Sequence, residues 1–199
     1  MATAASTLID EVRRKLNDAT DEAYSDELLL DAINDGSRIF STTTGCNQAI
    51  HNFTSETGSS IALSGLTNEY INVYAVEYAS GMLYWAPRSE AAKWSPTAAT
   101  PTGWNVWNAT LYLDKSITMS STNDVDVSYT YAAAALTVTS SNVDIPDRWM
   151  PAIKAYMEYH VHTKNRDAGL AAIAYQIFDS IRLVAAKTNE AQMSGGGNS

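Results

Sequence analysis

The chain has 199 residues, of which 45% are hydrophobic and 18% are charged, so its composition excludes an intrinsically disordered or fibrous protein and leaves enough apolar surface for a core. Its 22 acidic and 13 basic residues leave a net charge of -9, which argues against a protein that binds nucleic acid over a broad surface. The single cysteine, Cys46, cannot form an intrachain disulfide. We expect synthesis in a reducing cytoplasm, and neither a secretion signal nor a membrane-spanning segment.

The first 40 residues predict two amphipathic helices. Thr7, with Asp10 three residues later, is predicted to cap the first helix, and Ser25 is predicted to cap the second. Gly36 lies on the apolar stripe of the second helix at a cost of about 1 kcal/mol relative to alanine, which indicates either a close approach of another helix or a weak point of this helix. The apolar stripes are Leu8, Ile9, Val12 and Leu16 in the first helix and Leu29, Ile33, Gly36 and Phe40 in the second.

Residues 41–143 have a β composition, rich in Thr, Ser, Tyr, Trp and Val with frequent turn residues. The clearest strand is 125–131, where apolar and polar residues alternate. Further strands are predicted over 70–78, 104–107 and 111–113, with a turn at Asn108 and Ala109. A short helix is predicted over 89–94, and a loop over 96–101.

Two more helices are predicted after Asp144. Asp147 is a candidate cap for the first and Asp167 for the second, and the short connection between them makes the two helices antiparallel neighbours. The second has the most regular apolar period of the chain: Leu170, Ile173, Ala174, Ile177, Ile181 and Val184. We expect Ile173, Ile177 and Ile181 of this stripe to be buried.

These elements predict an α+β fold in which a helical scaffold, 1–40 and 144–187, is interrupted by a β-rich insert, 41–143. Residues 188–199 are predicted to be a flexible C-terminal arm, so that their deletion should leave the fold intact. The predicted helical core is Leu8, Val12, Leu16, Leu29, Ile33, Trp149, Ile153, Ile173, Ile177 and Ile181.

Candidate catalytic and metal-binding residues are few. Glu158 and His162 are four residues apart on a helix and could share a metal ion, but two such ligands arise often by chance. Cys46 and His51 lack a recognisable third group or oxyanion hole, so a small buried thiol is the simpler interpretation. The glycines match no phosphate-binding spacing. The sequence therefore predicts no catalytic residues, no cofactor, no metal and no enzymatic activity, although a hydrolase using Glu158 or His162 is a remaining alternative.

The 11 tyrosines and five tryptophans, many of them in the β-rich region, leave three interpretations open. Large aromatic side chains are typical of a core, of a protein interface and of a surface on which sugars stack. On the last interpretation the chain would be a carbohydrate-binding module, and Trp104 and Trp107 would be the binding residues.

Three segments carry a resemblance to a known family: LIDEVRRKLND at 8–18, YSDELLLDAINDG at 24–36 and IPDRWMPAI at 145–153. Together with the order of the predicted elements, they resemble the phage head-to-tail connector adaptors of tailed bacteriophages. The resemblance implies a structural subunit of the virion, located at the head-tail junction and made in the cytoplasm of the host bacterium. It also implies a ring, typically of about twelve copies, beneath the portal, which extends the DNA channel to the tail. The alternative is an aromatic-rich carbohydrate-binding or tail-recognition module of a phage.

The partners that this resemblance implies are further copies of the chain, the portal protein and a tail or nozzle protein. DNA would pass through the channel without specific binding, since acidic groups repel its phosphates. In that family the C-terminal arm commonly docks to the portal. The residues implied for this contact are Ala185, Ala186, Lys187, Thr188, Asn189, Glu190, Ala191, Gln192 and Met193.

Overall fold

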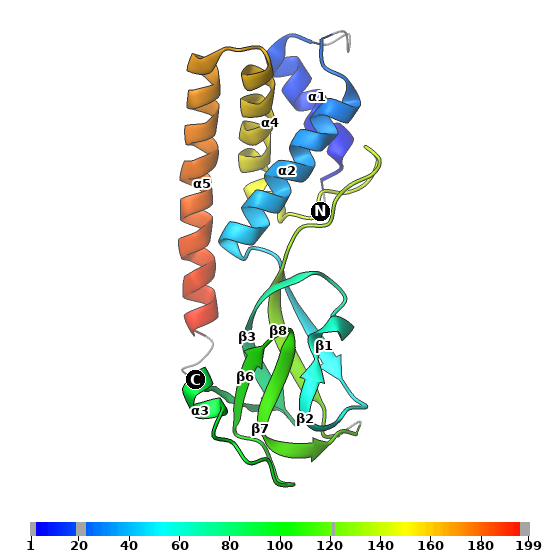
Figure 1. Ribbon diagram of the computed structural model, residues 1–199. Coiled ribbons are helices and arrows are strands. Elements are labelled where there is room, and N and C mark those ends of the chain that lie inside the picture. The colour runs from blue at the N-terminus through cyan, green and yellow to red at the C-terminus, as the bar shows by residue number, and fades with distance from the viewer. Residues whose placement is uncertain (1–2, 19–22, 121, 196–199) are drawn as a thin grey trace. The chain divides into compact units, whose positions relative to one another are not determined.

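A computed structural model describes residues 3–18, 23–120 and 122–195, and the chain divides into two compact units (Figure 1). The helical unit comprises Met1–Asn47 and Ala132–Ser199, and the β lobe comprises Gln48–Tyr131. The predicted α+β class, with a β lobe inserted in the chain between helices, is confirmed.

The β lobe is shorter than the predicted insert because both of its flanks pack with the helices. The second helix continues to Thr44. After the lobe, Ala133 N donates to Ser41 Oγ at 2.9 Å. Leu136 exchanges two hydrogen bonds with the side chain of Asn34, at 2.8 and 3.0 Å.

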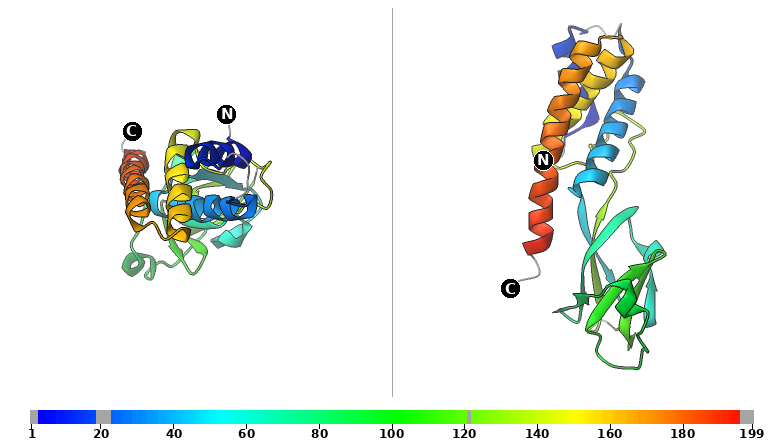
Figure 2. Two further views of the ribbon diagram at one scale, coloured as in Figure 1. Left: turned by 90° about the horizontal axis from the view of Figure 1, so that it is seen from above. Right: turned by 60° about the vertical axis from the view of Figure 1, so that its left-hand side comes forward.

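The described residues of the helical unit form four α-helices and a short 3-10 turn. The turn leads directly into the third of these helices, and the last two helices lie side by side and antiparallel, as predicted (Figures 1 and 2). The elements are α1 (Ala5–Leu16), α2 (Asp26–Thr44), η2 (Asp147–Trp149), α4 (Met150–Lys164) and α5 (Ala168–Gly195).

Two of the predicted helix caps are confirmed. Ser25 Oγ accepts from Leu28 N at 3.3 Å, and Asp167 Oδ1 accepts from Leu170 N at 3.1 Å. In both cases a short side-chain acceptor satisfies a backbone N-H that has no partner within its helix.

The predicted caps at Thr7 and Asp147 are wrong. α1 begins at Ala5, and its first N-H groups donate to backbone carbonyls of a distant segment: Ala5 N to Ser141 O at 3.0 Å and Ser6 N to Thr139 O at 2.8 Å. Asp147 lies inside η2, and its carboxylate accepts from Thr3 instead. A tertiary contact that supplies the acceptors makes a local cap unnecessary.

Most of the predicted helical core is confirmed. Leu8, Val12, Leu29, Ile33, Trp149 and Ile153 are buried, and Leu16 and Ile181 are partly buried against them. The close approach predicted at Gly36 is also confirmed, because a Cβ atom there would lie 2.8 Å from Cδ1 of Tyr156 on α4. Here α2 and α4 pack directly on each other.

The burial predicted for Ile173 and Ile177 is wrong, since 55% and 45% of these residues are exposed. α5 turns a different face to the core, formed by Ala171, Ala174, Phe178 and Ala185. Small side chains allow two helix backbones to approach closely, and Phe178 fills the space between them, packing edge-on against Tyr156 with ring centroids 5.1 Å apart.

The flexible C-terminal arm predicted from residue 188 is also corrected. The described part of that segment belongs to α5, which continues to Gly195. Asn189 is buried, and its Nδ2 donates to the carbonyl oxygen of Thr44 at 3.1 Å, near the C-terminal end of α2. The segment 188–195 is therefore part of the helical unit, and 196–199 lie outside the described residues.

Over residues 48–120 and 122–131, the β lobe forms two four-stranded sheets, with strand orders β1-β8-β3-β4 and β2-β7-β6-β5. All neighbouring strands are antiparallel except β5 and β6. The strands are β1 (Gln48–Phe53), β2 (Thr57–Ala62), β3 (Tyr70–Tyr78), β4 (Gly81–Met82), β5 (Tyr84–Trp85), β6 (Gly103–Trp107), β7 (Thr110–Thr118) and β8 (Val125–Tyr131). Two short helical elements, η1 (Leu63–Gly65) and α3 (Arg88–Ala91), lie between strands.

The strands, the short helix and the turn predicted in this region are confirmed. β8 alternates as expected, with Val125, Val127 and Tyr129 buried in the core of the lobe. Asn108 and Ala109 join β6 to β7 with φ angles of 48° and 54°, the left-handed conformation that two-residue hairpin turns require.

Candidate functional site

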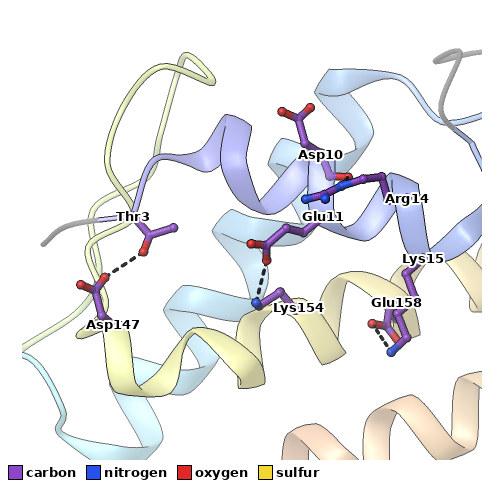
Figure 3. A network of polar contacts seen from close by, with 8 residues as sticks. All are labelled: Thr3, Asp10, Glu11, Arg14, Lys15, Asp147, Lys154 and Glu158. Carbon is purple, nitrogen blue, oxygen red and sulfur yellow. Dashed lines mark hydrogen bonds and ion pairs between the residues drawn. The ribbon is translucent and has the colours of Figure 1, made fainter.

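A network of ion pairs and hydrogen bonds joins α1 and the preceding residues to α4 and η2 (Figure 3). Lys15 Nζ lies 2.7 Å from both carboxylate oxygens of Glu158, and Lys154 Nζ lies 2.7 Å from Glu11 Oε2. Thr3 Oγ1 donates to Asp147 Oδ1 at 2.8 Å. The partners are 143 or 144 residues apart in sequence. The two ends of the chain are thus fastened into one helical frame.

The ion pair of Glu158 argues against the metal site considered for Glu158 and His162. The carboxylate is bound by an ammonium group on both oxygens. Within the described ranges, no group of three or more His, Cys, Asp or Glu side chains is placed to hold a metal ion. In this structure Glu158 contributes to the frame of the helical unit.

Cys46 is a buried thiol, as predicted. Its Sγ lies 3.4 Å from Asn47 Oδ1, and burial raises the pKa of the thiol above its ordinary value. A thiol held protonated in this way is a poor nucleophile. His51, the base considered for it, belongs to β1 and packs edge-on against Phe53, with ring centroids 4.5 Å apart.

One face of α5 exposes a stripe of large aliphatic side chains, which we call the apolar stripe. It follows helical spacing over about 21 Å of the helix. Its members, with their exposed fractions, are Leu170 (47%), Ile173 (55%), Ile177 (45%) and Val184 (58%). Apolar residues gathered on one face are typical of a surface that another molecule covers.

By length and composition, α5 is long and apolar enough over Ala168–Ala191 to cross a membrane, and 22% of its most apolar stretch is buried in the structure. The sequence predicted no such segment, but helices that pack inside soluble proteins can have the same length and composition. The helix carries Asp179 and Arg182, which form an ion pair at 2.6 Å. The function of the chain therefore depends on what covers the exposed face of α5.

A second apolar feature, which we call the hollow, lies at the N-terminal end of α5, beside the C-terminal end of α4. It has a volume of about 500 Å³. Tyr159 forms part of its wall, and the ring of Tyr175 lies beside Tyr159 with centroids 5.1 Å apart. The hollow is lined by Tyr159, Thr163, Arg166, Ala168, Ala171 and Ala172.

The residues implied for portal binding are divided by the structure into two groups. Ala185 and Asn189 face the core of the helical unit and are almost fully buried. Lys187, Glu190 and Ala191 are exposed, while Ala186, Thr188 and Met193 are half-buried and the side chain of Gln192 lies outside the described part.

A comparison with protein families decides the identity of the chain. The family described as SU10 adaptor protein matches residues 3–198. The chain belongs to this family. A comparison with curated proteins gave no match.

Membership of the SU10 adaptor family confirms the resemblance to phage head-to-tail adaptors. It supports a structural adaptor role in the virion, at the head-tail junction, with portal and tail components as partners and with oligomerisation. A structural adaptor family also points to a non-enzymatic role.

In the β lobe of this SU10 adaptor, some aromatic residues belong to the core and others lie on the surface. Trp104 is 3% exposed, and its Nε1 donates to Leu83 O at 3.2 Å, so it belongs to the core. Trp85 and Trp107 are exposed beside a separate cavity of about 540 Å³ in the β lobe. The guanidinium carbon of Arg88 lies 3.8 Å from the centroid of the Trp107 ring.

The apolar stripe of this SU10 adaptor is visible in the sequence as a helical period, but the period does not show whether the stripe is buried. The structure leaves Ile173 and Ile177 about half exposed. The signal that could have shown this is the second series, Ala171, Ala174, Phe178 and Ala185, which lies about 100° away around the same helix. In this subunit one of the two apolar faces of α5 is buried and the other is left exposed.

Proposed function

We propose that the chain is a ring-forming head-to-tail adaptor that sits beneath the portal and extends the DNA channel to the tail. Its family supports the adaptor role, and the observation that carries the ring is the apolar stripe of α5. Leu170, Ile173, Ile177 and Val184 are about half exposed in the single subunit. Fully burying such a side chain contributes about 1.5 to 3 kcal/mol, so covering the exposed half contributes about 1 kcal/mol each, which favours association of copies against its entropy cost.

The frame formed by α1, α2, α4 and α5 suits such an assembly. Its ends are joined by the ion pairs of Lys15 with Glu158 and of Lys154 with Glu11. A subunit that does not deform presents its contact surfaces at a fixed angle, which is what closure of a ring requires. The expected number of copies, about twelve, comes from the resemblance.

The charge of the chain suits passage of DNA. A net charge of -9 per subunit gives a ring of any size a strongly acidic surface, which repels phosphates and lets a duplex slide. We therefore propose that DNA passes through the ring without specific binding.

The portal contact is proposed for the exposed residues near the C-terminal end of α5, above all Lys187 and Glu190. Ala185 and Asn189 would support this contact from within, since both are buried in the helical unit. Charge reversal by Lys187→Glu with Glu190→Lys leaves the core untouched. Particles that carry this double variant and still retain their tails would contradict the portal contact.

Electron microscopy and native mass spectrometry of the purified chain, alone and mixed with its portal protein, test the proposal. We expect a ring of one defined size, which sits coaxially on the portal in the mixture. A chain that stays monomeric at all concentrations, and also in the presence of the portal, would overturn the proposed function.

A second candidate function rests on Trp85 and Trp107, which are exposed beside the cavity of about 540 Å³ in the β lobe. Exposed indole rings next to polar side chains are typical of carbohydrate-binding or recognition surfaces. Binding of the wild-type chain to a glycan array, lost in Trp85→Ala and Trp107→Ala, would support it. Trp104→Ala is not a suitable variant, because Trp104 is part of the core of the lobe.

A further inference from the structure

Closure of a ring needs two different patches on each subunit, one that fits the other on the next copy. The apolar stripe and the hollow have the properties of such a pair. We infer that the apolar stripe of one copy inserts into the hollow of the neighbouring copy, so that α5 supplies both halves of the lateral contact. This inference rests on the proposed ring and names its contact surface.

The arrangement of residues around α5 places the two patches on opposite flanks. At 100° per residue, the two patches lie about 170° apart around the helix. This angle joins the mean direction of the stripe residues Ile173, Ile177 and Val184 to that of the hollow residues Ala168, Ala171 and Ala172. The face between them carries Ala174, Phe178 and Ala185, and it is buried against the subunit's own helices. Stripe and hollow therefore face away from each other, as the two sides of a head-to-tail contact must.

The chemistry of the hollow matches the stripe. Its wall on α5 consists of alanine methyl groups, and its wall on α4 includes the ring of Tyr159. These groups favour aliphatic side chains, and the volume of about 500 Å³ lies within the range of sites that bind ligands specifically. Thr163 and Arg166 also line the hollow and supply its polar groups, which resembles the polar rim of a protein interface.

The main competing occupants are a second stripe and a lipid bilayer. Stripe against stripe is an isologous contact, which gives a closed dimer and cannot build a ring. Insertion of α5 into a bilayer would require the helical unit to open, because Ala174, Phe178 and Ala185 on the same helix are packed in its core. The structure thus favours a second copy, joined stripe to hollow.

Mixing two variants tests this arrangement. The stripe variant carries Ile173→Glu and Ile177→Glu, and the hollow variant carries Ala172→Arg. All three residues are exposed, so both variants should fold, which circular dichroism checks. The matched control is Gln176→Glu, which adds negative charge to an exposed position of α5 outside both patches.

By native mass spectrometry we expect wild type and control to form rings, and each variant alone to be monomeric. An equimolar mixture of the two variants should form heterodimers and nothing larger, since the intact stripe of the hollow variant fits the intact hollow of the stripe variant. Rings of the stripe variant, or a mixture that stays monomeric, would overturn the inference while leaving the proposed function standing. A wild type that forms no ring with the portal would overturn the proposed function itself.

Disulfide trapping provides a second measurement that does not disrupt the contact. Chains with Ile177→Cys and chains with Ala172→Cys, oxidised as a mixture, should give a cross-linked dimer, while either chain alone should not. Cross-linking of Ile177→Cys with itself would show a stripe-to-stripe contact and overturn the inference. Co-sedimentation of the wild-type chain with phosphatidylcholine vesicles would do the same.

Discussion

Lys15 Nζ lies 2.7 Å from both carboxylate oxygens of Glu158, which comes 143 residues later in the chain. The glutamate side chain is 12% exposed, whereas that of the lysine is 64% exposed. The ammonium group therefore reaches from the surface of α1 to a carboxylate that α4 holds largely away from water. This contact joins the first helix to a helix that forms only after the whole β lobe has been synthesised.

Replacing Lys15 by methionine should lower the free energy of unfolding by about 1 kcal/mol. The loss is smaller than for a fully buried pair, because water reaches the lysine side and screens the charge. Urea unfolding, with a double-mutant cycle that includes Glu158→Gln, measures the coupling. The pair of Lys154 and Glu11 is the control, since both of its side chains are about one third exposed and its coupling should be smaller.

Gly36→Ala should destabilise the helical unit by about 1 to 3 kcal/mol. The added methyl group would lie 2.8 Å from Cδ1 of Tyr156, and this overlap outweighs the gain in helix propensity of about 1 kcal/mol. Gly169→Ala is the matched control. Its nearest atom would be 3.7 Å away, so the same substitution should stabilise α5. A rise in Tm for both variants would contradict the close packing of α2 on α4.

Asp114→Asn should weaken the β lobe at neutral pH. The carboxylate accepts from Thr102 N at 2.8 Å, Gly103 N at 3.1 Å and Thr102 Oγ1 at 2.8 Å. Burial raises the pKa of Asp114, but these hydrogen bonds outweigh it, and the pKa lies below its ordinary value. We expect a loss of about 1 to 2 kcal/mol at pH 7.

The pH dependence of this effect has a definite sign. Because the folded-state pKa of Asp114 is lowered, its stabilising contribution is present above the ordinary aspartate pKa of about 4 and is lost as the pH falls through the lowered value. The difference between wild type and Asp114→Asn in chemical unfolding should therefore shrink between pH 5 and pH 2. A constant difference over that range would argue against the carboxylate as the cause.

A chain that ends at Thr188 should have a lower Tm than the full chain. It loses Asn189, which is 1% exposed and donates to Thr44 O at 3.1 Å, and leaving that carbonyl unpaired costs about 1 to 3 kcal/mol. A chain that ends at Met193 keeps this contact and serves as the control. Equal Tm values for the two truncations would instead support the predicted flexible arm over residues 188–199.

Much of the architecture could be predicted from local signals. The caps at Ser25 and Asp167, the turn at Asn108 and Ala109, and the alternation of β8 depend on neighbours within a few residues, so the sequence alone was enough to identify them. The close approach at Gly36 was predictable for a similar reason, since a glycine in a helix interior is costly unless a neighbour needs the space.

The start of α1 and the C-terminal end of α5 could not be predicted in this way. The first N-H groups of α1 find their acceptors on Thr139 and Ser141, and Asn189 finds Thr44. These partners are more than 130 residues away in the chain. The residue spacing within each helix contains no information about these partners. The start of α1 at Ala5 and the continuation of α5 beyond residue 188 therefore become apparent only in the folded structure.

The helical nature of α5 and its strong apolar period follow from the order of its residues, because periodicity depends on spacing along the chain. Which of its two apolar faces is buried depends on how α5 packs against the other helices. Ala171, Ala174 and Ala185 are less hydrophobic than Ile173 and Ile177, yet they are buried and the isoleucines are about half exposed. Close packing between α4 and α5 selects side chains by shape as well as by hydrophobicity: alanines lie where the backbones approach, and Phe178 fills the remaining space.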